Sequence, residues 1–190
     1  MLVLASASPR RRELLTQAGF TFKIHPANIP EDPLLREDPI AYVTRLAGQK
    51  AEAVYAQLSP NTPNLTVLGA DTTVTLDNQI LGKPEDPNYL EAAARMLRQL
   101  SGRTHRVITG VAIVTATGTQ VAAEVTAVQF LSLSEDEIAD YIATGEPRDK
   151  AGAYAIQGHA ARWIPRIEGC YFNVVGLPIS LVSSLLGALR

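Results

Sequence analysis

Residues 2–15 read Leu2-Val3-Leu4-Ala5-Ser6-Ala7-Ser8-Pro9-Arg10-Arg11-Arg12-Glu13-Leu14-Leu15. An apolar run passes directly into helix-start signals, because Ser8 is a favoured N-cap residue and Pro9 suits the first helical position. Gly19 suits the residue just past the end of that helix. The stretch therefore predicts a buried strand that turns straight into a helix, which is the opening unit of an α/β fold.

The first turn of this helix carries three consecutive arginines, Arg10, Arg11 and Arg12. A helix start has partial positive charge, so each cation there is disfavoured by about 0.3–1 kcal/mol when nothing binds. A bound phosphate or carboxylate reverses that sign, since backbone N–H groups, the helix dipole and guanidinium groups then converge on one anion. These residues alone leave two interpretations open: an anion site, or a basic turn that is solvated or paired to acids elsewhere.

Composition bounds the class of protein. The chain has 190 residues, of which 46% are hydrophobic and 19% charged, so we expect one globular domain over residues 1–190. The net charge of −2 argues against a general nucleic-acid binder. A single cysteine, Cys170, excludes an intramolecular disulfide, and no stretch approaches the roughly 20 apolar residues that span a bilayer. We expect a soluble, cytoplasmic protein.

Predicted helices and strands alternate along the chain. A short strand in 20–26 and a Pro- and acid-rich loop precede a helix over 39–57. We then expect a strand over 66–76, a turn at Asp77-Asn78 with a short strand ending at Leu81, a helix from after Asp86-Pro87 to Leu100, long strands over 104–115 and 120–131 joined at Thr117-Gly118, a helix opened by the capping box Ser134-x-x-Glu137, and an apolar helix after Pro178. This order predicts an α/β sandwich with a mixed sheet.

Lys50 is out of place on the helix over 39–57. At about 100° per residue, the apolar arc of that helix contains Lys50 beside Ile40, Val43, Leu46, Ala47, Ala51 and Val54. The commoner explanation is a lysine whose stem covers apolar surface while its ammonium reaches water. The alternative is a lysine that points into a cleft where a polyanion supplies the counter-charge.

Asp71 is out of place on the strand over 66–76. Period-two alternation puts Gly69, Asp71 and Thr73 on one face of an otherwise apolar strand, and aspartate is depleted in strands. Gly69 leaves space beside the carboxylate for a ligand or another backbone to approach closely. Such a carboxylate suits Mg²⁺ binding or activation of water, whereas the plain alternative is an aspartate that faces solvent or caps a turn.

Other charged residues add weaker signals. Glu31 offers a second carboxylate for a metal, although acidic loops are usually just solvated, and Lys83 follows the second strand as an extended residue before Pro84. The three histidines show no metal-ligand spacing. The sequence has no G-x-x-x-x-G-K-[ST], G-x-G-x-x-G, H-E-x-x-H or G-x-S-x-G motif, which leaves ATPase, Rossmann, zinc-protease and α/β-hydrolase functions unsupported.

Taken together, the motifs resemble the Maf family of nucleotide pyrophosphatases in order and over nearly the whole chain. They are residues 6–15 (SASPRRRELL), 45–51 (RLAGQKA), 69–72 (GADT), 81–84 (LGKP), 100–105 (LSGRTH), 109–111 (TGV), 149–158 (DKAGAYAIQG) and 174–178 (VVGLP). Ala155 departs from the pattern, which usually has glycine between Tyr154 and Ile156. The departure bears on the local backbone geometry.

The resemblance implies an enzyme that hydrolyses a nucleoside triphosphate to the monophosphate and pyrophosphate with a divalent cation, Mg²⁺ or Mn²⁺, as a house-cleaning activity. It implies a fold similar to that of inosine triphosphate pyrophosphatases, with two lobes around a deep cleft, and a homodimer. In the family, the residue matching Asp71 is regarded as the proton acceptor. The residues matching Glu31, Lys50 and Lys83 are the other functional positions.

Three further positions separate subfamilies, and Arg10, Thr72 and Gln157 match members acting on dTTP and UTP. Physical reasoning adds hypotheses: Asp71 and Glu31 hold the metal, Ser8 and Arg11 contact phosphate, and Arg10, Thr72 and Gln157 recognise the base. Modified pyrimidine nucleotides are further candidate substrates. The alternatives are a non-catalytic nucleotide-binding regulator of cell division and a 7-methyl-GTP pyrophosphatase of the same family.

Overall fold

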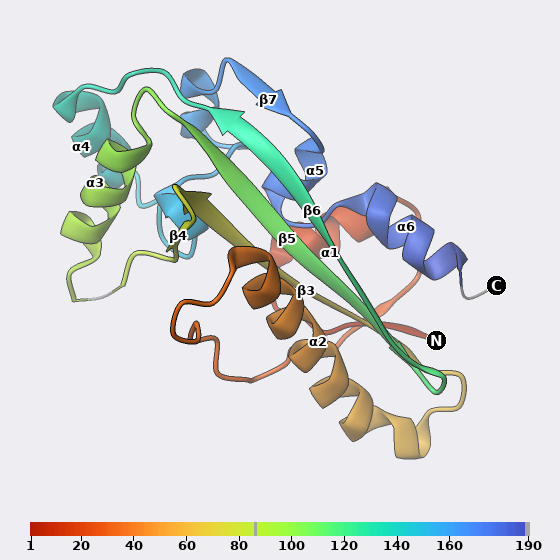
Figure 1. Ribbon diagram of the computed structural model, residues 1–190. Helices are drawn as coiled ribbons and strands as arrows, with labels where there is room; N and C mark the ends of the chain where they lie inside the picture. Colours follow the sequence, from red (N-terminus) through yellow and green to blue (C-terminus); the bar gives the residue numbers. More distant parts are fainter. Residues whose placement is uncertain (86, 189–190) are drawn as a thin grey trace. The chain divides into compact units, whose positions relative to one another are not determined.

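The computed structural model describes residues 1–85 and 87–188, which divide into two compact units (Figure 1). Among the described residues, the first unit comprises 1–72, 109–124 and 176–188, and the second comprises 73–85, 87–108 and 125–175. Three long strands pass from one unit into the other: β3 (Thr66–Leu76), β5 (Thr104–Thr115) and β6 (Gly118–Gln129). Among the described residues, no helix is both long and apolar enough to span a membrane.

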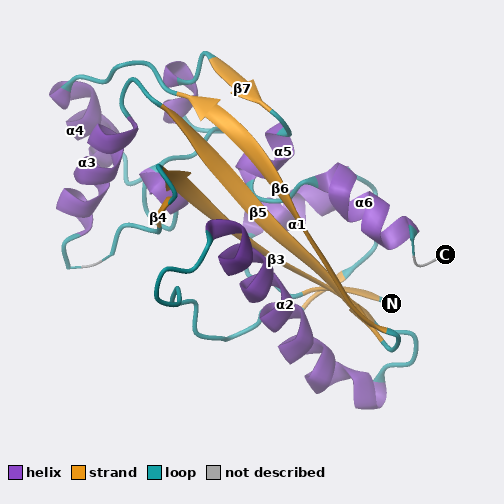
Figure 2. Ribbon diagram, viewed as in Figure 1, coloured by secondary structure: helices purple, strands orange, loops and turns teal. Residues whose placement is uncertain are grey.

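The strands form one mixed sheet, in which the order is β2-β1-β3-β5-β6-β7 and β4 pairs with β3 (Figure 2). β1 (Leu2–Leu4) runs parallel to both β2 (Lys23–Ile24) and β3. β4 (Gln79–Leu81) runs antiparallel to β3, and β7 (Arg166–Glu168) runs antiparallel to β6. The expected α/β class with a mixed sheet is confirmed.

In the first unit, helices cover both faces of the sheet (Figure 1). α1 (Pro9–Gln17) begins at the N-cap Ser8, as predicted, and α2 (Pro39–Leu58) is capped by Asp38. The core between α2 and the sheet consists of small and branched apolar side chains: Val3, Ala5, Ala47, Ala51, Val54, Leu65, Val67, Ala112 and Val114. α6 (Ile179–Gly187) follows Pro178, as predicted.

The second unit has an aromatic core. α3 (Tyr89–Leu100) packs beside α4 (Glu135–Ala143), and Tyr89, Phe130, Tyr141, Tyr154 and Trp163 are all buried in the same cluster. The capping box that was predicted at Ser134 and Glu137 is present. Short helical turns η2 (Ala151–Ala153) and η3 (His159–Trp163) and the helix α5 (Tyr171–Val175) complete this unit.

Most predicted elements occur close to their expected bounds, and the differences have local causes. The strand expected over 120–131 begins earlier, at Gly118, because the turn after β5 is tight and Thr117 N–H donates to Thr115 Oγ1 at 3.3 Å. Asp86, at the expected start of α3, lies outside the described residues. Ile40 was expected on the buried arc of α2 but is 41% exposed, because it lies in the first turn of α2.

The departure at position 155 needs no unusual backbone. Ala155 is not among the residues with positive φ, whereas the neighbouring Ala153 is, with φ of 60°. An alanine therefore replaces glycine at 155 without left-handed strain.

Candidate functional site

Lys50 and Asp71 form a buried ion pair in the first unit. Lys50 Nζ lies 2.7 Å from Asp71 Oδ1, and each residue is only 7% exposed. The lysine therefore does not reach solvent, and the interpretation that it covers apolar surface with its ammonium in water is wrong. Asp71 likewise does not face solvent. Burying this pair costs desolvation, which hydrogen bonds and further counter-charges must offset.

Glu31 completes a three-residue charge cluster. Its Oε1 lies 2.7 Å from the same Lys50 Nζ, and its side chain remains 44% exposed. One ammonium thus holds two carboxylates, which brings the oxygens of Glu31 and Asp71 to within the sum of two hydrogen-bond lengths of each other. The predicted acidic pair is close together, and one member is buried while the other is open to solvent.

Glycines on the sheet allow α2 to carry Lys50 this close. A Cβ at Gly69 of β3 would collide with Ala47 O and lie 2.9 Å from Ala51 Cβ, and one at Gly110 of β5 would collide with the backbone of Val43. The sequence left open whether Gly69 makes room for a ligand or for a backbone. In the structure, the backbone of α2 occupies the space beside Gly69.

Arg11 fastens the opposite side of β3. Its Nη1 donates to Ala70 O at 2.8 Å, its Nη2 to Thr72 Oγ1 at 3.0 Å, and its Nε to Gly176 O at 2.8 Å. Ala70 and Thr72 flank Asp71, so the guanidinium fixes the strand on both sides of the carboxylate. Its hydrogen-bond partners are carbonyls and hydroxyls, whereas one interpretation of the sequence paired these arginines with acids elsewhere in the chain.

The charges of this region are interdependent. Burial lowers the pKa of Arg11, while the negative charges of Asp71 and Glu31 raise it and the neighbouring Arg10 lowers it. Two cations, Arg11 and Lys50, therefore lie in the field of two carboxylates. The guanidinium of Arg11 and the ammonium of Lys50 are therefore coupled to the same carboxylates.

Thr72 has a fixed hydroxyl. Besides accepting from Arg11, its Oγ1 lies 2.9 Å from Thr109 Oγ1 and donates to Gly176 O at 3.3 Å. Ser8 caps α1 by accepting from Arg11 N–H at 3.4 Å, and Arg10 is partly buried in the first turn of the same helix. Direct contacts therefore join Ser8, Arg11 and Thr72 in one group and Lys50, Asp71 and Glu31 in another. The two groups meet in β3, where Asp71 and Thr72 are consecutive.

Lys83 and Gln157 belong to the second unit. Both are exposed: Lys83 lies in the loop after β4, and Gln157 lies between η2 and η3. Gly152 N–H donates to Gly82 O at 3.0 Å, which joins the segments that carry these two residues. The site described here is built from first-unit residues alone.

Two residues that sequence reasoning did not select lie beside the cluster. Tyr42 OH donates to Glu31 O at 2.8 Å, and Arg45 Nη2 donates to Asp32 O at 3.2 Å. Both residues lie on α2, on the same helix as Lys50. Arg45 lies five residues before Lys50 in the motif RLAGQKA, which could have marked it as a site residue. No local pattern links that motif to the loop that contains Glu31.

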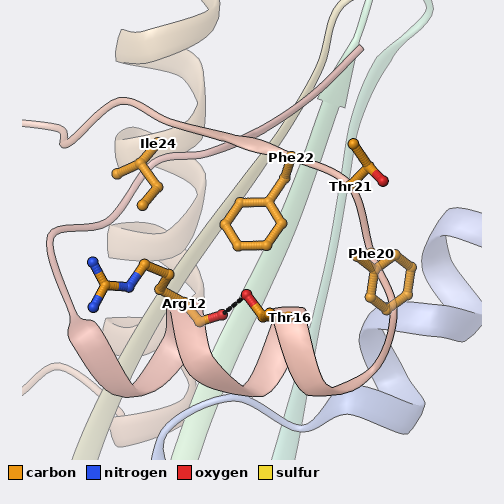
Figure 3. A pocket seen from close by; sticks show the side chains of 6 residues that line it. All are labelled: Arg12, Thr16, Phe20, Thr21, Phe22 and Ile24. Carbon is orange, nitrogen blue, oxygen red and sulfur yellow. Dashed lines mark hydrogen bonds between the residues drawn. The ribbon is translucent and has the colours of Figure 1, made fainter.

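An open depression of about 480 Å³ lies elsewhere in the first unit (Figure 3). It is lined by α1 and the segment leading into β2, with Arg12, Thr16, Phe20, Thr21, Phe22 and Ile24 around it. None of the predicted site residues lines it. Among residues 1–85 and 87–188, no group of three or more His, Cys, Asp or Glu side chains has the arrangement of a metal site.

The fold and the charge cluster define an α/β protein with a mixed sheet and a buried lysine–carboxylate centre. A Ham1 protein from Staphylococcus aureus has a similar fold, with a TM-score of 0.56 and 13% identity over 100% of this chain and 99% of that one. This likeness agrees with the fold expected from the resemblance to inosine triphosphate pyrophosphatases.

The chain belongs to the Maf family, because the family model described as "Maf-like protein" matches residues 1–189. A dTTP/UTP pyrophosphatase from Koribacter versatilis is 54% identical over 95% of this chain and 90% of its own length. A dTTP/UTP pyrophosphatase from Pyrococcus furiosus is 46% identical over 97% of this chain and 93% of its own length.

Proposed function

We propose that this protein hydrolyses nucleoside triphosphates, with dTTP and UTP as preferred substrates, to the monophosphate and pyrophosphate. The observation that carries the proposal is Lys50 Nζ at 2.7 Å from both Asp71 and Glu31 in a chain about half identical to proteins described as dTTP/UTP pyrophosphatases. Modified pyrimidine nucleotides are further candidates. The activity would remove unwanted nucleotides from the cellular pool.

Phosphoanhydride hydrolysis depends on positioning and charge neutralisation more than on covalent chemistry by the protein. Asp71 would accept a hydrogen bond from the attacking water and orient it. Lys50 would hold the Asp71 carboxylate in place and, together with Lys83 and the positive charge of Arg11, balance charge that grows on the leaving pyrophosphate.

Asp71 and Glu31 fit a divalent cation, because both offer hard carboxylate oxygens and lie close enough to share one ammonium. Mg²⁺ usually binds through one or two carboxylates together with water and substrate phosphates, so two protein ligands suffice. Mg²⁺ or Mn²⁺ bound there would polarise the phosphate oxygens of the substrate.

We assign recognition of the substrate to residues near the start of α1, on β3 and between η2 and η3. Ser8 and the first turn of α1 would contact phosphate, because backbone N–H groups at a helix start favour anions. Arg10, Thr72 and Gln157 would form hydrogen bonds that distinguish a pyrimidine from a purine. Contacts with Arg11 and Gly176 O hold the Thr72 side chain in one position, which supports a role for this residue in a shaped recognition site.

The remaining features of the proposal concern the context in which the enzyme acts. We propose that residues 1–190 function as one catalytic domain, that two copies form a homodimer, and that the protein is cytoplasmic. The net charge of −2 supports free nucleotides as substrates rather than nucleic-acid polymers or membranes. A single cysteine is in keeping with a reducing compartment.

The test is pyrophosphate release from a panel of nucleoside triphosphates, including 7-methyl-GTP and modified pyrimidine nucleotides, with Mg²⁺, with Mn²⁺ and with a chelator. We expect release from dTTP and UTP that requires the metal. Nucleotide binding without pyrophosphate release would replace the proposal by a regulatory, non-catalytic function. Preferred release from 7-methyl-GTP would assign the chain to a different substrate.

A further inference from the structure

The loop over residues 28–38, which carries Glu31, is not held in place by apolar burial. None of its residues is buried, and Leu34 and Leu35 are 61% and 94% exposed. Its position next to Lys50 must therefore depend on polar contacts.

Those contacts come from the first two turns of α2. Tyr42 OH donates to Glu31 O at 2.8 Å, which ties the backbone of Glu31 itself to the helix. Arg45 binds both carboxylate oxygens of Glu37, with Nε to Oε1 at 2.6 Å and Nη2 to Oε2 at 2.7 Å. The same Nη2 donates to Asp32 O at 3.2 Å, so one guanidinium binds the loop at both Asp32 and Glu37.

Glu37 also makes a hydrogen bond within the loop. Its Oε2 also accepts from Leu34 N–H at 2.9 Å, which closes the turn at the exposed tip. The side chains of Arg45 and Glu37 are only 23% and 8% exposed, whereas those of Arg98 and Glu135, a second two-pronged pair, are 52% and 68% exposed. A shielded pair with two parallel hydrogen bonds has more geometric specificity than an open one.

The ionisation states of Glu37, Arg45 and Tyr42 favour these contacts at neutral pH. The hydrogen bond from Arg45 lowers the pKa of Glu37, and the same bond raises the pKa of Arg45. Burial, with the negative charges of Asp71 and Glu31, raises the pKa of Tyr42 to about 12, so its hydroxyl stays protonated and donates to Glu31 O. All three contacts therefore persist through the neutral range.

We infer that Arg45 and Tyr42 are positioning residues that hold the Glu31 carboxylate against Lys50 and thus beside Asp71. Tyr42, Arg45 and Lys50 all belong to α2. Glu31 contacts this helix twice, because its backbone carbonyl accepts from Tyr42 and its carboxylate pairs with Lys50. The consequence for catalysis rests on the proposed function, whereas the consequence for the loop does not.

The first experiment compares Arg45→Lys with the matched control Arg98→Lys, which removes a similar two-pronged pair on α3. Lysine keeps the charge but cannot make two parallel bonds and a third to Asp32 O. We expect faster hydrogen exchange of the peptide over residues 28–38 in Arg45→Lys alone. We also expect kcat/KM for dTTP to fall about 10-fold, while Arg98→Lys stays within about 2-fold.

A double-mutant cycle separates positioning of Glu31 from a general structural role. If Arg45 acts through Glu31, Arg45→Lys has little further effect on kcat/KM in a Glu31→Gln background, because the two changes are coupled. Independent, multiplicative losses in that background would overturn the inference. Tyr42→Phe, which removes one hydroxyl only, gives the same cycle should Arg45→Lys fold poorly.

The outcomes distinguish this inference from the proposed function. A wild-type protein without pyrophosphate release defeats the proposed function, yet the exchange measurement still decides whether Arg45 and Tyr42 hold the loop. An active wild type with unchanged exchange and unchanged kcat/KM in Arg45→Lys defeats the inference alone.

Discussion

Two buried polar centres, one in each unit, are built in opposite ways. In the first unit Lys50 forms ion pairs with two carboxylates from other segments. In the second unit His105 is 2% exposed and packs edge-on against Phe130 and Tyr154, with ring centroids 5.0 and 5.3 Å apart. Burial lowers the pKa of His105 to about 4, so this ring is neutral at pH 7.

The difference shows which buried polar groups indicate function. A neutral ring among aromatic side chains fits the packing of a core, and His105 makes one hydrogen bond, between Nε2 and Tyr154 OH at 2.7 Å. A buried ion pair contributes little net stability compared with apolar residues of the same size. The Lys50 centre is therefore the one that folding alone does not explain.

The largest expected effect tests the charged centre. Asp71→Asn should lower pyrophosphate release at least about 100-fold, because the amide cannot accept a proton from water. The fold should persist, since asparagine has the same shape and Lys50 keeps Glu31 as a counter-charge. The measurements are steady-state turnover and a thermal melt, with Asp140→Asn on the exposed face of α4 as the control. Near-normal turnover would remove Asp71 from the mechanism.

The sequence predicted elements best where local signals mark both ends. β3 occupies the predicted residues, since Asp77 and Asn78 adopt φ of 51° and 64° in the tight turn that ends it. β7 was not predicted, because it has three residues and exists only through its pairing with β6. Short strands depend on their neighbours more than on their own pattern.

The site was predicted in its residue types but not in its contacts. Periodicity identified Lys50 and Asp71 as misplaced, yet it favoured a solvent-exposed ammonium for Lys50 because most such lysines reach water. The pairing with Glu31 depends on how a loop returns to α2, which no periodic pattern encodes. For the same reason the sequence did not connect Arg11 with Ala70 O or Arg45 with Glu37.

The next effect tests the neutral centre through pH. The unfolded histidine binds a proton below its ordinary pKa of 6.5, while buried His105 stays neutral down to about 4. Protons therefore favour unfolding in this window, and His105 should lower the free energy of unfolding by about 3 kcal/mol from pH 6.5 to 4 and contribute no pH dependence above it. Urea unfolding between pH 4 and 8 measures this dependence.

A matched variant isolates the contribution of His105 to that curve. His105→Gln keeps a hydrogen-bonding group but does not titrate, so its difference from the wild type should shrink as the pH falls from 6.5 to 4. Carboxylates titrate in both proteins and cancel in the comparison. Parallel curves for the two proteins would mean that His105 is not held neutral.

The smallest effect tests whether the two centres are functionally separate. Tyr154→Phe removes the hydroxyl that His105 Nε2 contacts, and His105 Nδ1 already has no hydrogen-bond partner among the described residues. The neutral ring is then left without its one hydrogen bond, which should lower the free energy of unfolding by roughly 1–2 kcal/mol. Tyr171→Phe, at a residue that is 41% exposed, is the control and should change stability little.

Because the aromatic centre serves packing, turnover per folded molecule of Tyr154→Phe should stay within about 2-fold of the wild type, a difference of less than about 0.5 kcal/mol in activation free energy. A loss of turnover larger than the loss of folded protein would show that the second unit's centre belongs to the catalytic machinery, and the contrast between the two centres would fail.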